Sequence, residues 1–102
     1  MGKNTDPILD EQSAARLAEL FDSLSDPTRL RILALLAEGE VNVGELVKQL
    51  GLSKSAVSHQ LRGLRDRRVI RARRQGRQVF VALDDAHIGD IFRRGLDHIL
   101  HE

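Results

Sequence analysis

The residues best suited to chemistry in this 102-residue chain are three histidines gathered near its end: His87, His98 and His101. Asp85 stands two residues before the first of them. Imidazole nitrogens and carboxylate oxygens are donors that Zn²⁺ binds, most often four in a tetrahedron. Three imidazoles and one carboxylate would fill all four positions, and Co²⁺ is an alternative ion for the same donors. Because a catalytic metal ion keeps one coordination position open, this set of four ligands favours a sensing or structural metal site over a catalytic one.

A single chain is unable to assemble this site if its end is helical. Apolar residues recur there with helical spacing, which predicts a helix over residues 85–101. His87 and His98 are almost three full turns apart, so they share a face of that helix but lie about 16 Å apart along its axis. A Zn–N bond is only about 2 Å long.

Two chains overcome this distance. Packed antiparallel across a twofold axis, two copies of the helix would bring the start of one beside the end of the other. Each site would then combine ligands from two subunits: Asp85 and His87 of one, His98 and His101 of the other. The histidines follow one edge of an apolar stripe that would form the contact: Ile88, Ile91, Gly95 and Ile99. In the alternative interpretation, the histidines are exposed residues of an amphipathic helix that Asp84 and Asp85 cap.

Composition limits the remaining possibilities. The chain is 41% hydrophobic and 30% charged, which is typical of a single globular domain, here residues 1–102. It has no cysteine, which excludes disulfides, thiolate ligands and thiol redox sensing. No apolar run approaches the roughly 20 residues that cross a bilayer, and MGKNTDPILDE lacks the apolar core of a signal peptide. We therefore expect a cytoplasmic protein without a membrane partner.

Positive charge is concentrated in the second half of the chain. The formal net charge is +1, yet residues 54–77 contain nine lysines and arginines against one acid. The segments on either side are acidic, with net charges of −4 for residues 1–53 and −3 for residues 78–102. Such a concentration indicates a surface that binds a polyanion. A solvated charged face without a partner is the alternative.

Helical spacing dominates the chain before this basic segment. Regularly spaced leucines predict a helix over residues 11–24. In SDPTRLRILALLAEG, Asp26 is a suitable cap for a second helix and Pro27 suits its first position, where a missing N–H costs nothing. Gly39 is the expected end of that helix.

A helix-turn-helix is predicted over residues 43–66. In VNVGELVKQLGLS, Asn42 and Glu45 match a capping box, and Gly51 marks a turn. Ser53 can cap the next helix, KSAVSHQLRGLRDR. Its inward residues lie at i, i+4 and i+7: Val57, Leu61 and Leu64. Helix, tight turn and helix in this order are typical of DNA-binding proteins.

The outward face of that second helix suits the major groove of DNA. It carries short polar groups and cations: Lys54, Ser55, Ser58, His59 and Arg62. Two β-rich runs then predict a hairpin over residues 69–83, which would form a wing. Its tip carries Arg73, Arg74 and Arg77, which can neutralise phosphates. RNA is a less suitable partner, because the exposed aromatic residues that stack on single strands are missing. We therefore expect double-stranded DNA as the partner.

Together these elements predict a mainly α-helical fold with a small β-hairpin, that is, a winged helix-turn-helix followed by a last helix. Over nearly its whole length the sequence resembles the ArsR/SmtB family of bacterial winged-helix repressors. The stretches that carry this resemblance are SDPTRLRILALL and LGLSKSAVSHQLRGLRDRRVIRARRQGRQVFVAL. The pattern D-x-H-x10-H-x2-H, from Asp85 to His101, is similar to the C-terminal-helix metal site of the family's zinc and cobalt sensors.

The resemblance implies a homodimeric repressor that binds its operator when metal-free and releases it when Zn²⁺ or Co²⁺ binds, controlling metal-efflux or resistance genes. It also implies that helices 11–24 and 85–101 form the dimer interface. Many relatives place cysteines in the helix matching VNVGELVKQL, and their absence makes thiophilic ions poor ligands. MGKNTDP has no histidine, which favours four-coordinate zinc, with the α-amino group or Asp6 left open as further ligands.

Two other classes of protein compete with this prediction. One is a DNA-binding regulator that responds to a non-metal signal, with structural histidines. The other is a metal hydrolase, which would need an open coordination position and a general base. The sequence indicates neither an open coordination position nor a general base, so we do not expect an enzyme.

Overall fold

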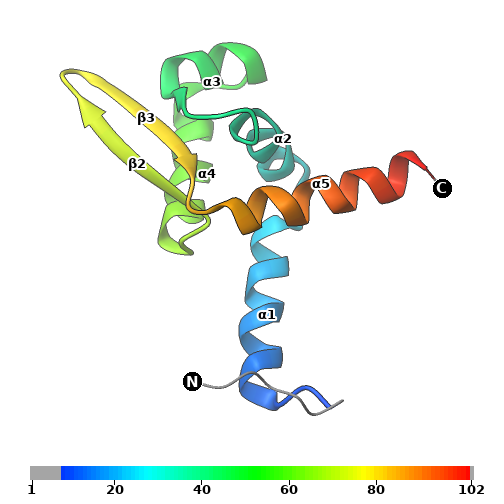
Figure 1. Cartoon of the computed structure of the whole chain (residues 1–102). Helices are drawn as coiled ribbons and strands as arrows, with labels where there is room; N and C mark the ends of the chain where they lie inside the picture. Colours follow the sequence, from blue (N-terminus) through cyan, green and yellow to red (C-terminus); the bar gives the residue numbers. More distant parts are fainter. Residues whose placement is uncertain (1–7, 102) are drawn as a thin grey trace.

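The computed structural model describes residues 8–101 and has the predicted winged helix-turn-helix fold (Figure 1). A hairpin extends from one side of a helical body, and the last helix crosses that body. In chain order the elements are α1 (Glu11–Leu24), α2 (Pro27–Leu36), β1 (Val41–Asn42), α3 (Val43–Leu50), α4 (Lys54–Asp66), β2 (Ile70–Gln75), β3 (Gln78–Leu83) and α5 (Ala86–Leu100). The prediction of a mainly α-helical chain with a β-hairpin is confirmed.

Side-chain caps determine where the helices begin. Asp10, Asp26 and Ser53 each accept a hydrogen bond from the backbone N–H three residues ahead, at 2.8 Å, 3.0 Å and 3.0 Å. Each bond satisfies a donor that has no partner inside its helix. Asp26 and Ser53 are the caps predicted from the sequence, and Pro27 is the first residue of α2 as expected.

The capping box predicted for α3 is incomplete. The Asn42 side chain caps the helix by accepting from the N–H of Gly44 at 2.7 Å. Glu45, however, accepts from the Gln49 side chain at 2.9 Å, one turn further along. An i,i+4 pair on the helix surface has therefore replaced the expected return bond to the cap.

Two other boundaries also differ from the predictions. α2 ends at Leu36, before Gly39, because the chain closes in a turn in which the N–H of Gly39 donates to the Leu36 carbonyl at 3.0 Å. α5 begins after Asp85, whose side chain is the cap. Asp84, the other residue expected to cap, does not have this role.

A short strand that the sequence analysis did not predict joins the hairpin to the body. β1 has only two residues and pairs antiparallel with β3, so the strand order is β1-β3-β2. The hairpin itself lies within the predicted residues 69–83. It turns at Gly76, whose φ of +64° strains any residue with a Cβ.

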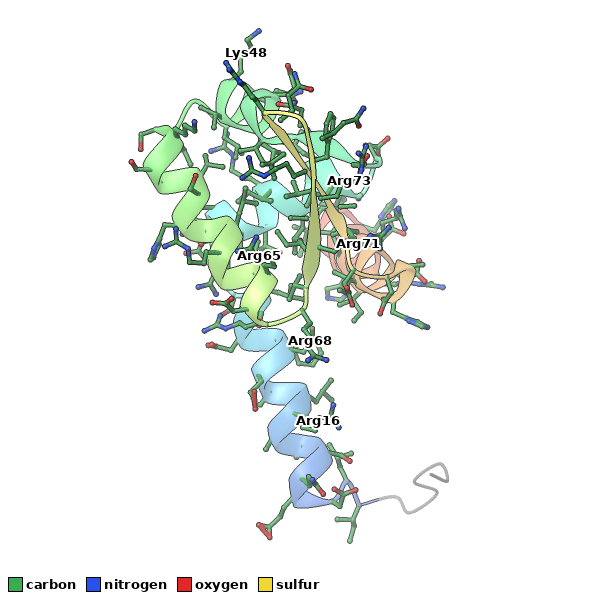
Figure 2. The ribbon with its side chains drawn as sticks, turned by 90° about the vertical axis from the view of Figure 1, so that its left-hand side faces the viewer. Arg16, Lys48, Arg65, Arg68, Arg71 and Arg73 are labelled. Atoms are coloured by element: carbon green, nitrogen blue, oxygen red, sulfur yellow. The ribbon has the colours of Figure 1, made fainter. Side chains whose placement is uncertain are left out.

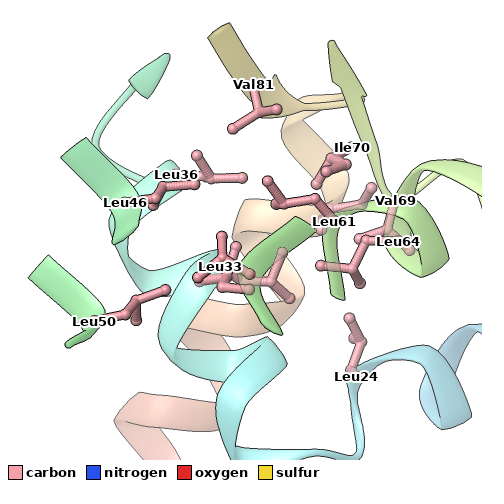
Figure 3. Close-up of a cluster of buried hydrophobic side chains, with 13 residues drawn as sticks. Leu24, Leu33, Leu36, Leu46, Leu50, Leu61, Leu64, Val69, Ile70 and Val81 are labelled. Carbon is pink, nitrogen blue, oxygen red and sulfur yellow. The ribbon is translucent and has the colours of Figure 1, made fainter. Parts of the chain in front are cut away.

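The hydrophobic core lies where α2, α3 and α4 meet the sheet (Figure 3). Leu33 of α2, Leu46 of α3 and Leu64 of α4 are fully buried there, and Val81 of β3 covers them from the sheet side. Burying one such side chain contributes about 1.5–3 kcal/mol. The predicted inward face of α4 is confirmed, and its burial directs the polar face of that helix outward.

α1 and the end of α5 project from this core (Figure 1). Large apolar side chains are exposed on both helices: Leu17, Phe21, Leu96, Ile99 and Leu100. Ile88 is only 7% exposed, and Ile91 packs against the core of its own subunit. The apolar stripe expected to form the dimer contact is therefore corrected. Ile88 and Ile91 belong to the subunit's own core, and only Gly95 and Ile99 of the stripe are exposed.

Among the described residues, no helix combines the length and apolarity that crossing a membrane requires.

Candidate DNA interface and metal half-sites

A basic groove of about 620 Å³ lies between α4 and the wing. Five cations line it, two from the wing and three from α4: Arg74, Arg77, Lys54, Arg62 and Arg65. Asn42 and Ser58 add short polar groups. None of the described residues that line the groove is acidic. A concave surface of one sign of charge attracts a polyanion over a long range.

Strand and helix periodicity build this groove. Ile70, Ala72 and Arg74 alternate along β2 and therefore share the face of the wing that looks toward α4. On α4, Arg62 and Arg65 are three residues apart and so lie on one side of the helix. The groove thus brings together cations from α4 and from the wing, which follow each other along the chain with only a turn between them.

The predicted DNA-contacting residues fall into three groups. Lys54, Ser58, Arg62, Arg74 and Arg77 line the groove. Ser55 and His59 are exposed on α4 outside it. Arg73 lies on the opposite face of the wing. Arg65 also lines the groove but was not among the predicted contacts, although its position three residues after Arg62 indicates that it shares the same helix face.

Arg73 is held by contacts within the chain. Its Nη2 lies 2.7 Å from Glu40 Oε1 and its Nε lies 2.8 Å from Glu40 Oε2, which makes a two-point ion pair. Its guanidinium also stacks on Phe80, 4.6 Å from the ring centroid. Figure 2 shows Arg71 and Arg73 on the side of the hairpin nearer α5, whereas Arg65 extends from α4 on the other side.

The first of two candidate half-sites, each a pair of the expected metal ligands, lies at the start of α5. Asp85 Oδ1 accepts from the N–H groups of His87 at 2.8 Å and Ile88 at 3.4 Å, which caps the helix. His87 Nδ1 is 3.4 Å from the same oxygen, and the His87 side chain is 90% exposed. The carboxylate and the imidazole therefore already lie next to each other at the surface. Within residues 8–101, the hydrogen bonds and the ion-pair contact of the Asp85 side chain all involve Oδ1.

The second half-site lies at the other end of the same helix. His98 and His101 are exposed and one turn apart. His101 Nδ1 is 2.8 Å from the Asp97 carbonyl oxygen. When Nδ1 carries the proton it donates to that oxygen, which orients the ring and leaves Nε2 as the ligating atom.

The two half-sites remain apart in one chain. Within residues 8–101, no group of three or more histidine, aspartate or glutamate side chains is close enough to hold a metal ion. Asp6 and the α-amino group, the further ligands left open by the sequence, lie outside the described residues. The four expected ligands thus form two pairs at opposite ends of α5.

A polar helix beside a basic wing, both supported by a helical core, defines the class of this protein. It is a winged-helix DNA-binding protein.

Comparison with known proteins identifies the family. The family model "Bacterial regulatory protein, arsR family" matches residues 26–72. The "Transcriptional repressor SmtB homolog" of Synechocystis sp. is 41% identical over 92 residues, which are 90% of this chain and 70% of that protein. The "HTH-type transcriptional regulator NmtR" of Mycobacterium tuberculosis is 38% identical over 93 residues, 91% of this chain and 78% of that protein. The chain belongs to the ArsR family, and it is a DNA-binding transcriptional repressor and not an enzyme.

A solved structure agrees with this assignment over almost the whole chain. The AntR antimony-specific transcriptional repressor superimposes with a TM-score of 0.85 at 31% sequence identity, covering 98% of this chain and 96% of that chain.

Proposed function

We propose that this chain is a metal-responsive repressor that binds operator DNA as a metal-free homodimer and releases it when Zn²⁺, or Co²⁺, binds between subunits. The genes under its control would be those of metal efflux or resistance. The observation that carries the proposal is the pair of exposed half-sites at the two ends of one projecting helix. Neither half-site has enough donors by itself, but two antiparallel copies would supply both halves of each site.

The exposed apolar surfaces support a dimer. Phe21 on α1 is 51% exposed and Ile99 on α5 is 58% exposed, although both are large apolar side chains. The Cα radius of gyration is 15.3 Å, compared with about 13 Å for a compact chain of this length. A partner that packs against α1 and the end of α5 would cover these surfaces and give the assembly a more compact shape.

The donor set fits zinc without requiring the helix to unwind. Asp85 can keep Oδ1 on its cap and present Oδ2, while the bond from His101 to Asp97 leaves Nε2 available. Bound Zn²⁺ would supply a rigid link between two subunits that are otherwise joined by side-chain packing. Three imidazoles and one carboxylate leave no open position, as expected for a regulatory ion.

In the DNA complex, the groove would hold the phosphate backbone beside the wing. Arg62, Arg65, Arg74 and Arg77 would contact phosphates and supply affinity, which depends on salt. Lys54, Ser55, Ser58 and His59 would reach base edges or phosphates from α4. Metal binding would lock the α5 pair in a geometry that misaligns the two α4 helices with successive major grooves. Thermodynamic linkage then requires that DNA weaken zinc binding by the same factor by which zinc weakens DNA binding.

The deciding experiment titrates Zn²⁺ and Co²⁺ into the apo-protein with fluorescein-labelled promoter DNA of its own operon, following DNA release and Co²⁺ absorption together. We expect release at one metal ion per chain and the strong absorption of tetrahedral Co²⁺. His98→Ala should keep DNA binding and lose the metal response. Arg94→Ala, an exposed α5 residue outside the donor set, is the matched control.

A regulator that responds to another signal makes the opposite prediction. In that case, His98→Ala would release DNA with zinc as the parent does, or neither protein would respond to metal at all. Tight zinc capture by a protein trapped as a single folded subunit would also contradict the inter-subunit site.

A further inference from the structure

Arg73 differs from its neighbours on the wing. Arg74 and Arg77 line the groove, whereas Arg73 lies on the opposite face of β2 because side chains alternate along a strand. Its contacts there are with Glu40, with Phe80 and with the side chain of Gln75, whose Oε1 accepts from Arg73 Nη1 at 2.8 Å. A phosphate in the groove would therefore be on the wrong side of the sheet for this guanidinium.

The Arg73 contacts cross all three strands. Arg73 on β2 is paired in register with Phe80 on β3, and Phe80 is paired with Asn42 on β1. Glu40 immediately precedes β1. The ion pair therefore passes over the Phe80 ring and ties the outer strand of the hairpin to the segment that leads into α3.

Three interactions hold Arg73 in this position, and the hydrogen bond to Gln75 lies within β2 itself. The two-point ion pair fixes the plane of the guanidinium as well as its location. The Phe80 ring below it adds a cation–π contact. The hydrogen bonds from Arg73 lower the pKa of Glu40, which favours the ionised carboxylate that the ion pair requires.

We propose that Arg73 is a positioning residue which, with Glu40, fixes the angle of the wing so that Arg74 and Arg77 face α4. It does not bind DNA itself. The inference rests on the groove between α4 and the wing being the DNA-binding surface. Its physical basis is that a two-strand ribbon is flexible unless its outer strand is tied to the body, and β1 pairs only with β3.

The test is the salt dependence of binding by the full-length protein to a fluorescein-labelled, mixed-sequence DNA duplex. Glu40→Gln is the informative variant because the two roles predict opposite results. If Arg73 positions the wing, losing the ion pair lowers the fraction of molecules whose wing is in the DNA-binding position, and DNA binding weakens by about two- to fivefold. If Arg73 is a phosphate ligand, Glu40→Gln releases it, and binding tightens with a steeper salt slope.

Arg73→Gln and a charge exchange complete the test. Arg73→Gln should weaken binding as Glu40→Gln does, and combining the two changes should add little, because each removes the same ion pair. The double variant Glu40→Arg with Arg73→Glu should regain binding with the parental salt slope. A lost phosphate contact would instead flatten that slope by about 0.9 per subunit.

Two controls separate this inference from the proposed interface. Glu38→Gln removes the same charge in the same loop, at a side chain for which the described structure shows no ion pair, and it should not weaken binding. Arg74→Ala should weaken binding and flatten the slope. If Arg74→Ala bound DNA as tightly as the parent, the assignment of the groove as the DNA-binding surface would be overturned. Unchanged or tighter binding by Glu40→Gln, with Arg74→Ala still weak, would overturn the role of Arg73 alone.

Discussion

Asp85 has two roles that substitution can separate. As the cap of α5 it accepts hydrogen bonds from two backbone N–H groups, and as a proposed zinc ligand it contributes a negatively charged oxygen. Asparagine keeps the accepting oxygen but loses the charge, whereas alanine loses both. We therefore expect both variants to impair metal binding, and Asp85→Asn to lose less apo-protein stability than Asp85→Ala.

The magnitudes follow from the contacts. Replacing an aspartate cap by alanine costs about 1 kcal/mol, and the bond from the His87 N–H is short at 2.8 Å. Asparagine should cost only the interaction of the charge with the helix dipole, about 0.3–1 kcal/mol. For zinc, removing one of four ligands should weaken binding by more than the roughly 10–100-fold loss typical of a residue that only orients a ligand.

Two measurements test this at one protein concentration, because a dimer's stability depends on concentration. Urea unfolding with chelator present gives the apo-stability, and competition with a chromophoric chelator gives the zinc affinity. Asp84→Asn is the control, since Asp84 is exposed and neither caps α5 nor belongs to the donor set. Parental zinc affinity in Asp85→Asn would refute its role as a ligand. Parental apo-stability in Asp85→Ala would refute the energetic argument for the cap.

Three other predictions concern the turn, the exposed helix and the ion pair. Gly51→Ala should destabilise the folded protein by about 1 kcal/mol because φ is +68° there. Gly63→Ala, inside α4 with open space around it, should stabilise the folded protein by about 0.5–1 kcal/mol. Chemical unfolding of both variants measures the two effects, and equal effects would contradict the strain argument. Ile99→Asp should make the protein monomeric in sedimentation experiments and abolish zinc-dependent DNA release, and a dimer that survives would place the interface elsewhere. The Glu40 pKa is lowered in the folded state by the hydrogen bonds from Arg73, so the ion pair stabilises the fold at pH values above the ordinary carboxyl pKa, and this stabilisation is lost as pH falls through the folded-state pKa. The difference in unfolding free energy between the parent and Glu40→Gln should therefore be present at neutral pH and disappear in acid. A difference that persists in acid would have a cause other than the ion pair.

Much of the fold could be predicted from local sequence. Asp26 and Ser53 begin their helices because a short oxygen-bearing side chain satisfies backbone donors within one turn. The spacing of Val57, Leu61 and Leu64 identified the buried face of α4, since only one face of an amphipathic helix can reach the core. The interactions that determine these features lie within a few residues of one another.

The candidate site was only partly predictable for the same reason. Positive charge, helical spacing and the donor pattern on α5 are visible in the chain. β1 was missed because two residues carry no periodic signal, and it exists only through its pairing with β3. The capping role of Asp85 in preference to Asp84 depended on where the hairpin ends and α5 starts.

The sequence by itself determined the helix-turn-helix, the concentration of positive charge and the two pairs of candidate metal donors, because each depends on residue type and short-range spacing. Only the tertiary structure decided that Ile88 is buried in its own subunit, that Leu96 and Ile99 remain exposed, and that Arg73 pairs with Glu40 away from the groove. Those outcomes depend on which segments, distant along the chain, pack together. Strand pairing and core burial set that arrangement, and neither is encoded in any one stretch of residues.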